Sequence, residues 1–209
     1  MEKLMKLAKQ AVDQAEIYYT ESVSDSLSFT DSKFDKADTS LRSGMALRII
    51  KDGRIGYAHT RNLLSAESLL DQAIQSSKEG MSVNFQMPLT TKVKELNSYN
   101  PAIEKISKKD LISQAKKMIE YVQKRTDGQL NLSFGYGTDK AGIINSAGTS
   151  LEERESSFYI VAELIFPGTG SGLYKYIQSR ELSDFPYAKL DEMIDRKSTR
   201  LNSSHRIRS

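Results

Sequence analysis

The chain of 209 residues contains no cysteine and two histidines, and its 30 Lys and Arg against 27 Asp and Glu give a formal charge of +3. The missing cysteines exclude disulfides, thiolate zinc sites and cysteine nucleophiles. No apolar run approaches the ~20 residues of a membrane-spanning helix, and the first residues lack the apolar core and cleavage site of a signal peptide. We therefore expect a soluble cytoplasmic protein with one large or two small domains.

The chain opens with an amphipathic helix, because its apolar residues recur at helical spacing. They are Leu4, Leu7, Ala8, Ala11, Val12 and Ala15. Residues 15–40 then alternate between apolar and polar side chains. Ile17 and Tyr19 form one apolar set. Leu27 and Phe29 form a second one, and Ser-Asp punctuation between the two sets predicts two antiparallel strands.

The clearest hairpin lies around Asp52 and Gly53, since Asp-Gly suits the positive φ angles of a tight turn. Alternating side chains flank this turn on both sides: Met45, Leu47 and Ile49 before it, and Ile55, Tyr57 and His59 after it. We predict that the two sets pair across the turn on one face. A helix over residues 66–78, capped by Ser65 and ended by Gly80, should pack on that face.

The middle of the chain reads as a connection followed by a helix. Residues 81–106 have no apolar period and contain Pro88 and Pro101, which predicts a linker or crossing loop. Ser107 and Asp110 then resemble a capping box, and the helix behind them places apolar residues on one face.

The remainder alternates like β-strands. Its first apolar set is Leu130, Leu132, Phe134 and Tyr136. Residues 142–154 read as a strand, a turn and a strand, and residues 157–167 as a longer, more buried strand. This order predicts an α+β fold of antiparallel sheets with packed helices. The predicted division is a unit over 1–80, the linker at 81–106, a second unit over 107–194 and a tail at 195–209.

Few side chains carry a chemical signal. His59 ends a hairpin strand and is a candidate catalytic base, although a half-buried or rim histidine is the ordinary interpretation. Residues 168–172, GTGSG, lack the spacing of a phosphate loop and favour a flexible connection between strands. The acids from Glu152 to Glu155 favour a solvated strand face over paired carboxylates for acid–base work. We therefore assign no catalytic, cofactor-binding or metal-binding residue.

Several stretches together carry a family resemblance. Residues 44–60 contain G-x-x-x-R from Gly44, the hairpin turn, then Gly56-Tyr57-Ala58 leading into a helix. In this order of elements the sequence resembles the N-terminal domain of the TldD/PmbA family, bacterial and archaeal proteins often described as modulators of DNA gyrase. The turn at 145–148 is similar to the family's Asn-Ser-x-Gly turn. Residues 179–185, SRELSDF, are similar to a stretch near the end of the family's N-terminal half.

The resemblance covers residues 1–194 and implies a subunit of a zinc metallopeptidase that acts on unfolded peptides. In the family's catalytic subunit, an H-E-x-x-x-H helix beyond the N-terminal domain holds the zinc, whereas the PmbA type lacks this motif and pairs with the catalytic subunit. Neither the motif nor its downstream ligand occurs in this sequence. The resemblance therefore implies that this chain contains no cofactor site of its own, and we expect it to be inactive alone.

Two functions remain open. The chain is either the part of a metallopeptidase subunit that frames the substrate chamber, or a non-catalytic, PmbA-like accessory subunit that binds peptide or a catalytic partner. The polar strand at 24–40 is the kind of sheet edge to which a peptide adds as an extra strand, although a solvated sheet face is the ordinary interpretation of such a strand. The implied partners are a second TldD/PmbA-type subunit, like or unlike, and an unfolded peptide, with no nucleic acid and no membrane.

The tail at 195–209 carries the positive charge of the chain. It holds five Lys and Arg and one acid, so the rest of the chain has a net charge of −1. Its first residues, DRKSTRLNSSH, match the translation of a common sequencing-library adapter. We therefore predict that this tail is non-native and disordered. We also expect that the native protein continues after Ile194 with residues other than these. The case for nucleic-acid binding rested on this tail alone.

Overall fold

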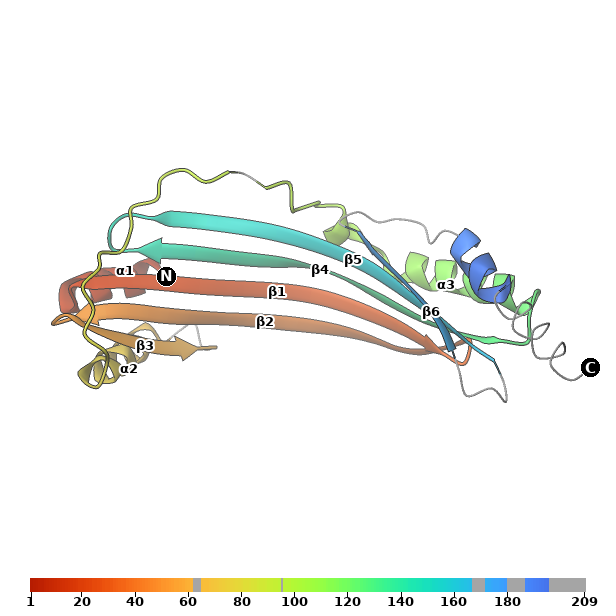
Figure 1. Cartoon of the computed structure of the whole chain (residues 1–209), viewed down its shortest axis with the longest axis horizontal. Coiled ribbons are helices and arrows are strands. Elements are labelled where there is room, and N and C mark those ends of the chain that lie inside the picture. The colour runs from red at the N-terminus through yellow and green to blue at the C-terminus, as the bar shows by residue number, and fades with distance from the viewer. Residues whose placement is uncertain (62–64, 95, 167–171, 180–186, 196–209) are drawn as a thin grey trace, which may run out of the picture. The chain divides into compact units, whose positions relative to one another are not determined.

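The computed structural model describes residues 1–61, 65–94, 96–166, 172–179 and 187–195 (Figure 1). The named elements follow the chain as α1 (Glu2–Ala11), β1 (Gln14–Thr30), β2 (Lys33–Lys51), β3 (Arg54–Thr60), α2 (Ala66–Lys78), η1 (Ile103–Lys105), α3 (Lys108–Gln123), β4 (Gln129–Asn145), β5 (Ser150–Ile165) and β6 (Gly172–Ser179). Residues 187–195 form a further helix. No described helix is long and apolar enough to cross a membrane.

The strands form one six-stranded sheet in the order β3-β2-β1-β4-β5-β6. β2 pairs with β3, and β5 with β6, in the antiparallel direction, and helices cover part of the sheet (Figure 1). The fold is therefore α+β, as predicted. A single sheet takes the place of the several sheets that we expected.

The chain folds into two compact units that interleave along the sequence. Unit 1 consists of Met1–Val23, Leu41–Ser98 and Asp139–Glu155, and unit 2 takes Ser24–Ser40, Tyr99–Thr138 and the described residues from Ser156 onward. This division differs from the predicted consecutive blocks 1–80 and 107–194. The reason is that β1, β2, β4 and β5 are long enough for each to contribute residues to both units.

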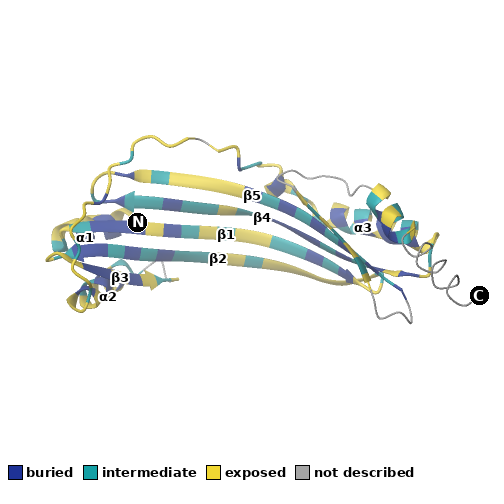
Figure 2. Cartoon of the chain, in the orientation of Figure 1, coloured by how far each residue is buried: buried dark blue, intermediate teal, exposed yellow. Residues whose placement is uncertain are grey.

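The prediction of two strands within residues 15–40 placed the break between them at the wrong residues. β1 runs without a break through the Ser-Asp stretch, and the chain turns later, at Asp31 and Ser32, whose φ angles are 51° and 62°. β2 then continues into the first arm of the predicted hairpin. A strand inside a sheet has neighbours on both sides that complete its backbone hydrogen bonds, so a polar stretch remains extended without apolar side chains. Figure 2 shows these exposed residues along β1 and β2.

The core of unit 1 lies between the sheet and helices α1 and α2. Its buried residues are Leu4, Met5 and Ala8 of α1, Ala15 and Ile17 of β1, Met45, Leu47 and Ile49 of β2, Ala58 of β3, and Leu69, Leu70 and Ala73 of α2. The predicted packing of the hairpin on the helix at 66–78 is confirmed. Gly56 allows this contact, because a Cβ atom there would lie 2.3 Å from the carbonyl oxygen of Ala73.

The hairpin turn is also confirmed, with φ angles of 50° at Asp52 and 69° at Gly53. However, the predicted facing of β3 was wrong. Leu47 lies opposite Ala58, and Arg48 lies opposite Tyr57. A two-residue turn pairs an odd-numbered residue with an even-numbered one, so the alternating sets before and after the turn lie on opposite faces.

Residues 81–98, which we name the strap, contain one isolated bridge, between Ser82 and Arg54, and otherwise no helix or strand in their described part. Hydrogen bonds hold the strap to the sheet. The backbone N–H of Met87 donates to Gln14 Oε1 at 2.6 Å, and Ser98 Oγ donates to the carbonyl oxygen of Arg154 at 2.8 Å. The predicted linker at 81–106 is thus irregular but attached at both ends of the strap.

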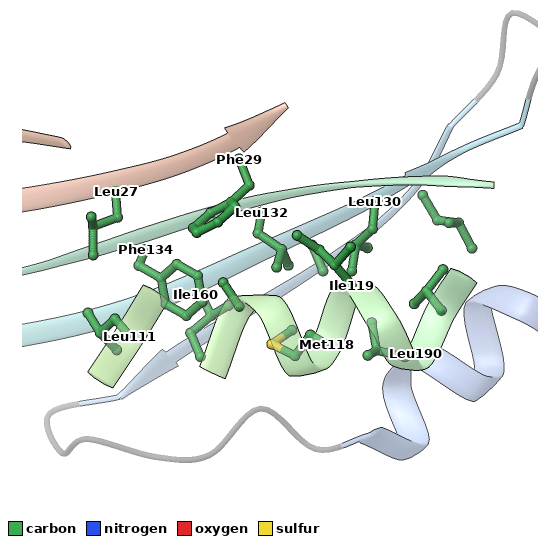
Figure 3. Packing of buried hydrophobic residues seen from close by; sticks show 14 of the residues in the cluster. Leu27, Phe29, Leu111, Met118, Ile119, Leu130, Leu132, Phe134, Ile160 and Leu190 are labelled. Carbon is green, nitrogen blue, oxygen red and sulfur yellow. The ribbon is translucent and has the colours of Figure 1, made fainter. Parts of the chain in front are cut away.

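The core of unit 2 lies between the sheet and α3, together with the helix at 187–195 (Figure 3). The residues of this core that Figure 3 labels are Leu27 and Phe29 of β1, Leu111, Met118 and Ile119 of α3, Leu130, Leu132 and Phe134 of β4, Ile160 of β5, and Leu190.

The Ser107 side chain accepts a hydrogen bond from the backbone N–H of Asp110, as the capping box predicts. The described part of the last helix includes Asp195, the first residue of the predicted tail, and the rest of that tail lies outside the described residues.

Candidate functional site

Unit 1 contains an open hollow on the face of its sheet that α1 and α2 leave uncovered. Its volume is about 690 Å³, and its polar lining includes Tyr18, Thr20, Arg42, His59, Arg61 and Asp139. Alternate residues of a strand point to opposite faces. Ile17 and Leu47 enter the helix-covered core, so their neighbours Tyr18 and Ala46 belong to the hollow.

His59, the single histidine that we considered as a base, lines this hollow. Its side chain is exposed, beyond the half-buried or rim position that we judged ordinary. No described residue forms a hydrogen bond or ion pair with the side chain of His59, Arg61 or Asp139. A general base needs a partner that orients it and a nucleophile within reach. The described surroundings of His59 supply neither, and its assignment as non-catalytic stays a prediction.

Arg48, the last residue of the G-x-x-x-R stretch, has a structural contact. Its Nη2 atom lies 2.5 Å from Oε1 of Glu16, and its guanidinium lies over the Phe85 ring of the strap, 5.9 Å from the centroid. Both partners belong to unit 1. The arginine of this stretch therefore helps to hold the sheet and the strap together, and its contacts do not indicate a reacting group.

A polar cluster lies on the other face of the unit 1 sheet. Tyr19 Oη donates to Glu152 Oε2 at 2.8 Å, and Lys140 Nζ lies 3.0 Å from the same oxygen. Burial and then the bond to Glu152 raise the pKa of Tyr19 to about 12. Hydrogen bonds from Lys140 and Tyr19 lower the pKa of Glu152 below its ordinary value. The strand face at residues 152–155, which we predicted to be solvated, thus contains one carboxylate, that of Glu152, with contacts inside the protein.

Tyr19 occupies space that only a glycine leaves open. A Cβ atom on Gly142 would lie 2.2 Å from Cζ of the Tyr19 ring. The ring therefore lies directly on the backbone of β4. Sequence reasoning missed this contact, because 123 positions separate the two residues and no local pattern connects them.

The Asn-Ser-x-Gly turn has a structural explanation. Asn145, 2% exposed, donates from Nδ2 to the carbonyl oxygen of Pro88 at 2.8 Å and accepts from the backbone N–H of Thr149 at 3.0 Å. Ser146 exchanges two bonds with the backbone of Ala15, at 2.7 and 3.0 Å. The turn therefore ties the β4–β5 connection to the strap and to the start of β1.

Unit 2 presents an exposed strand edge. β3 pairs with β2 only from Met45 to Lys51, and residues 33–39 of β2 are exposed throughout. Beside this edge, Lys108 Nζ lies 2.6 Å from Asp25 Oδ1 and donates to Thr39 Oγ1 at 2.8 Å. Burial opposes the effect, but hydrogen bonds from Lys108 and Thr39 lower the pKa of Asp25.

The described residues do not fit a zinc ion. No group of three or more His, Asp or Glu side chains converges within the part of the chain that the structure describes. Structural and catalytic zinc sites take at least three protein ligands, so no chemical step can be assigned to zinc held by these residues. Of the other candidate, the GTGSG stretch, residues 168–171 lie outside the described residues.

One part of the chain matches a known protein family. Residues 15–77 match the family described as PmbA/TldA metallopeptidase domain 1. The chain is 24% identical over 174 residues to the uncharacterized protein MJ0231 of Methanocaldococcus jannaschii. This alignment covers 82% of this chain and 40% of that protein.

Solved structures share the fold. TldE from Thermococcus kodakarensis superposes with a TM-score of 0.78 at 19% identity, over 94% of this chain and 46% of that one. A putative modulator of DNA gyrase from Thermotoga maritima gives a TM-score of 0.78 at 20% identity, over 92% and 45%. The chain thus spans less than half the length of each relative.

Proposed function

We propose that this chain, which carries an N-terminal domain of the TldD/PmbA family, frames the substrate chamber of a metallopeptidase subunit that acts on unfolded peptides. Its residues bind and align the peptide backbone. The zinc that such a subunit uses for hydrolysis would be held outside this domain, since the described residues offer no ligand group for it. On its own the chain is expected to bind peptide without cleaving it.

The observation that carries this proposal is the outer edge of β2 at residues 33–39. No described strand pairs with that side of β2, because β3 ends its pairing at Met45. Seven extended residues span roughly 20 Å. An unfolded peptide adds to such an edge through main-chain hydrogen bonds, which do not depend on its side chains. Binding of this kind suits a substrate defined by being unfolded.

The edge is held in place before a peptide arrives. Asp25 accepts hydrogen bonds from both Thr39 and Lys108, so the β2 edge is fixed to β1 and to the first turn of α3. A strand that is already ordered loses less conformational entropy on binding. The polar side chains along residues 33–39 also keep the edge soluble while no peptide is bound.

Two neighbouring proline substitutions test the edge. Outward-facing N–H groups alternate along a strand, so one of Lys36→Pro and Ala37→Pro removes an outward donor and the other removes a donor bonded to β1. We expect the variant that loses an outward donor to keep the wild-type melting temperature and to lose binding of a labelled unfolded peptide, measured by fluorescence anisotropy. The variant that loses a donor bonded to β1 should have a lower melting temperature. If the stable variant binds peptide like the wild type, the β2 edge is not the binding site.

The alternative function, a PmbA-like accessory subunit, uses the same edge to bind peptide or a catalytic partner. A longer protein that contains this domain distinguishes the two. Chelator-sensitive cleavage of an unfolded peptide by that protein alone identifies a catalytic subunit. Cleavage that appears only after a second TldD/PmbA-type subunit is added identifies an accessory one.

A further inference from the structure

We propose that the hollow of unit 1 binds a carboxylate group of a peptide, either its C-terminus or an acidic side chain. This inference rests on the proposed function in naming a peptide as the ligand. It adds a second contact, in a different unit from the β2 edge, and it gives the domain a chemical preference that backbone pairing does not provide.

The floor of the hollow is built from small residues. Gly44 and Ala46 of β2 line it, and a Cβ atom on Gly44 would meet no atom closer than 3.8 Å. The walls are larger side chains, among them Tyr18 and His59. A volume of about 690 Å³ lies within the range of about 300–1,000 Å³ that small-molecule sites occupy. The hollow therefore accommodates one or a few peptide residues.

The charges of the lining match a single negative charge. Two guanidinium groups, those of Arg42 and Arg61, oppose one carboxylate, that of Asp139. Planar guanidinium groups bind carboxylates through two parallel hydrogen bonds. Asp139 repels a polyanion such as a nucleic acid, but it can accept a hydrogen bond from a peptide N–H. A monoanionic peptide group therefore fits this lining better than a phosphate backbone.

Three side chains of the hollow differ from polar side chains elsewhere in unit 1. Arg48, Tyr19 and Asn145 all form contacts that hold the fold together. In contrast, the side chains of Arg61, His59 and Asp139 form no hydrogen bond or ion pair with any described residue. Polar groups that the fold does not use are available for a ligand.

Three short peptides test the proposal on the whole chain: N-acetyl-tetraalanine with a free carboxylate, the same peptide as its amide, and an amide with glutamate at the last position. Affinities are measured by NMR titration. We expect at least one acid to bind about tenfold more tightly than the neutral amide, the ratio expected from one charge-assisted contact. Preference for the free C-terminus or for the glutamate peptide identifies the source of the carboxylate.

Substitutions then locate the contact. Arg61→Gln should bring the acids to within about twofold of the amide, whereas the matched control Arg54→Gln, at the other end of β3, should leave the preference unchanged. Gly44→Leu fills the floor without removing a charge and should abolish acid binding in a protein whose spectrum shows an intact fold. Equal binding of acid and amide, no binding of any of the three, or an unchanged preference in Arg61→Gln overturns the inference. The proposed function fails separately, through the proline variants of the β2 edge.

Discussion

The two faces of the unit 1 sheet use similar residues for different purposes. On the face covered by α1 and α2, leucines are buried, and Tyr19 and Glu152 bond to each other. On the open face, Tyr18 is exposed, and the His59 side chain has no described partner. Substitutions of the same residue type on the two faces should therefore differ in their effect on folding, which makes the comparison testable.

The largest difference is expected between two leucines of β2. Leu47 is fully buried, whereas Leu41 is 74% exposed. Leu47→Ala should lower the free energy of unfolding by about 2–5 kcal/mol, because it removes buried methyl groups and leaves a cavity. Leu41→Ala should change it by no more than about 0.5 kcal/mol. Urea denaturation of both variants measures the contrast, and similar losses would show that the burial assigned to the two leucines is wrong.

Asn145 and His59 provide the second comparison. Asn145→Ala removes the side-chain partner of the buried N–H of Thr149, whereas the carbonyl of Pro88 keeps its bond from Thr149 Oγ1. An unsatisfied buried group costs about 1–3 kcal/mol in unfolding free energy. His59→Ala removes an exposed side chain and should cost less than about 0.5 kcal/mol. A stable Asn145→Ala protein would contradict the structural explanation of the turn.

Two glycines give the third comparison. Gly142→Ala places a methyl group within 2.2 Å of the Tyr19 ring, while the nearest atom to the same group on Gly44 lies at 3.8 Å. The first substitution should destabilise the protein by about 1–3 kcal/mol through overpacking, and Gly44→Ala should be nearly neutral. The cost of Gly142→Ala should fall when Tyr19→Ala is already present. Thermal melting of the four variants checks this coupling.

The smallest effect concerns two carboxylates. Because Lys140 and Tyr19 lower the pKa of Glu152 in the folded state, its contribution to stability is fully present above the ordinary glutamate value of about 4.3 and is lost as pH falls through the lowered pKa. Glu152→Gln should therefore cost up to about 1 kcal/mol at neutral pH and less in acid. Asp139→Asn, in the hollow, changes a side chain without a described partner and should cost less than about 0.5 kcal/mol at neutral pH. An equal cost of Glu152→Gln at pH 7 and pH 3 would disprove this origin.

The site was less predictable than the fold. His59 was the one polar residue of the hollow that the sequence singled out, because histidine is rare in this chain. Arg42, Arg61 and Asp139 carry no local motif. They meet only because β1, β2, β3 and β4 lie side by side in the sheet. The polar composition of residues 24–40 suggested a sheet edge only as an alternative to a solvated face, and the missing partner of β2 at 33–39 follows from where the pairing of β3 ends.

Local patterns in the sequence determined the first helix, the Asp52–Gly53 turn, the helix at 66–78, the Ser107 cap and the α+β class, because each depends on residues only a few positions apart. The tertiary structure alone decided which side of β3 faces the core, how β1 continues through its polar middle, and why Gly142 must be a glycine. These features depend on neighbours far apart in the chain. An extended backbone receives its hydrogen bonds and its packing from other strands, so its own side chains do not reveal them.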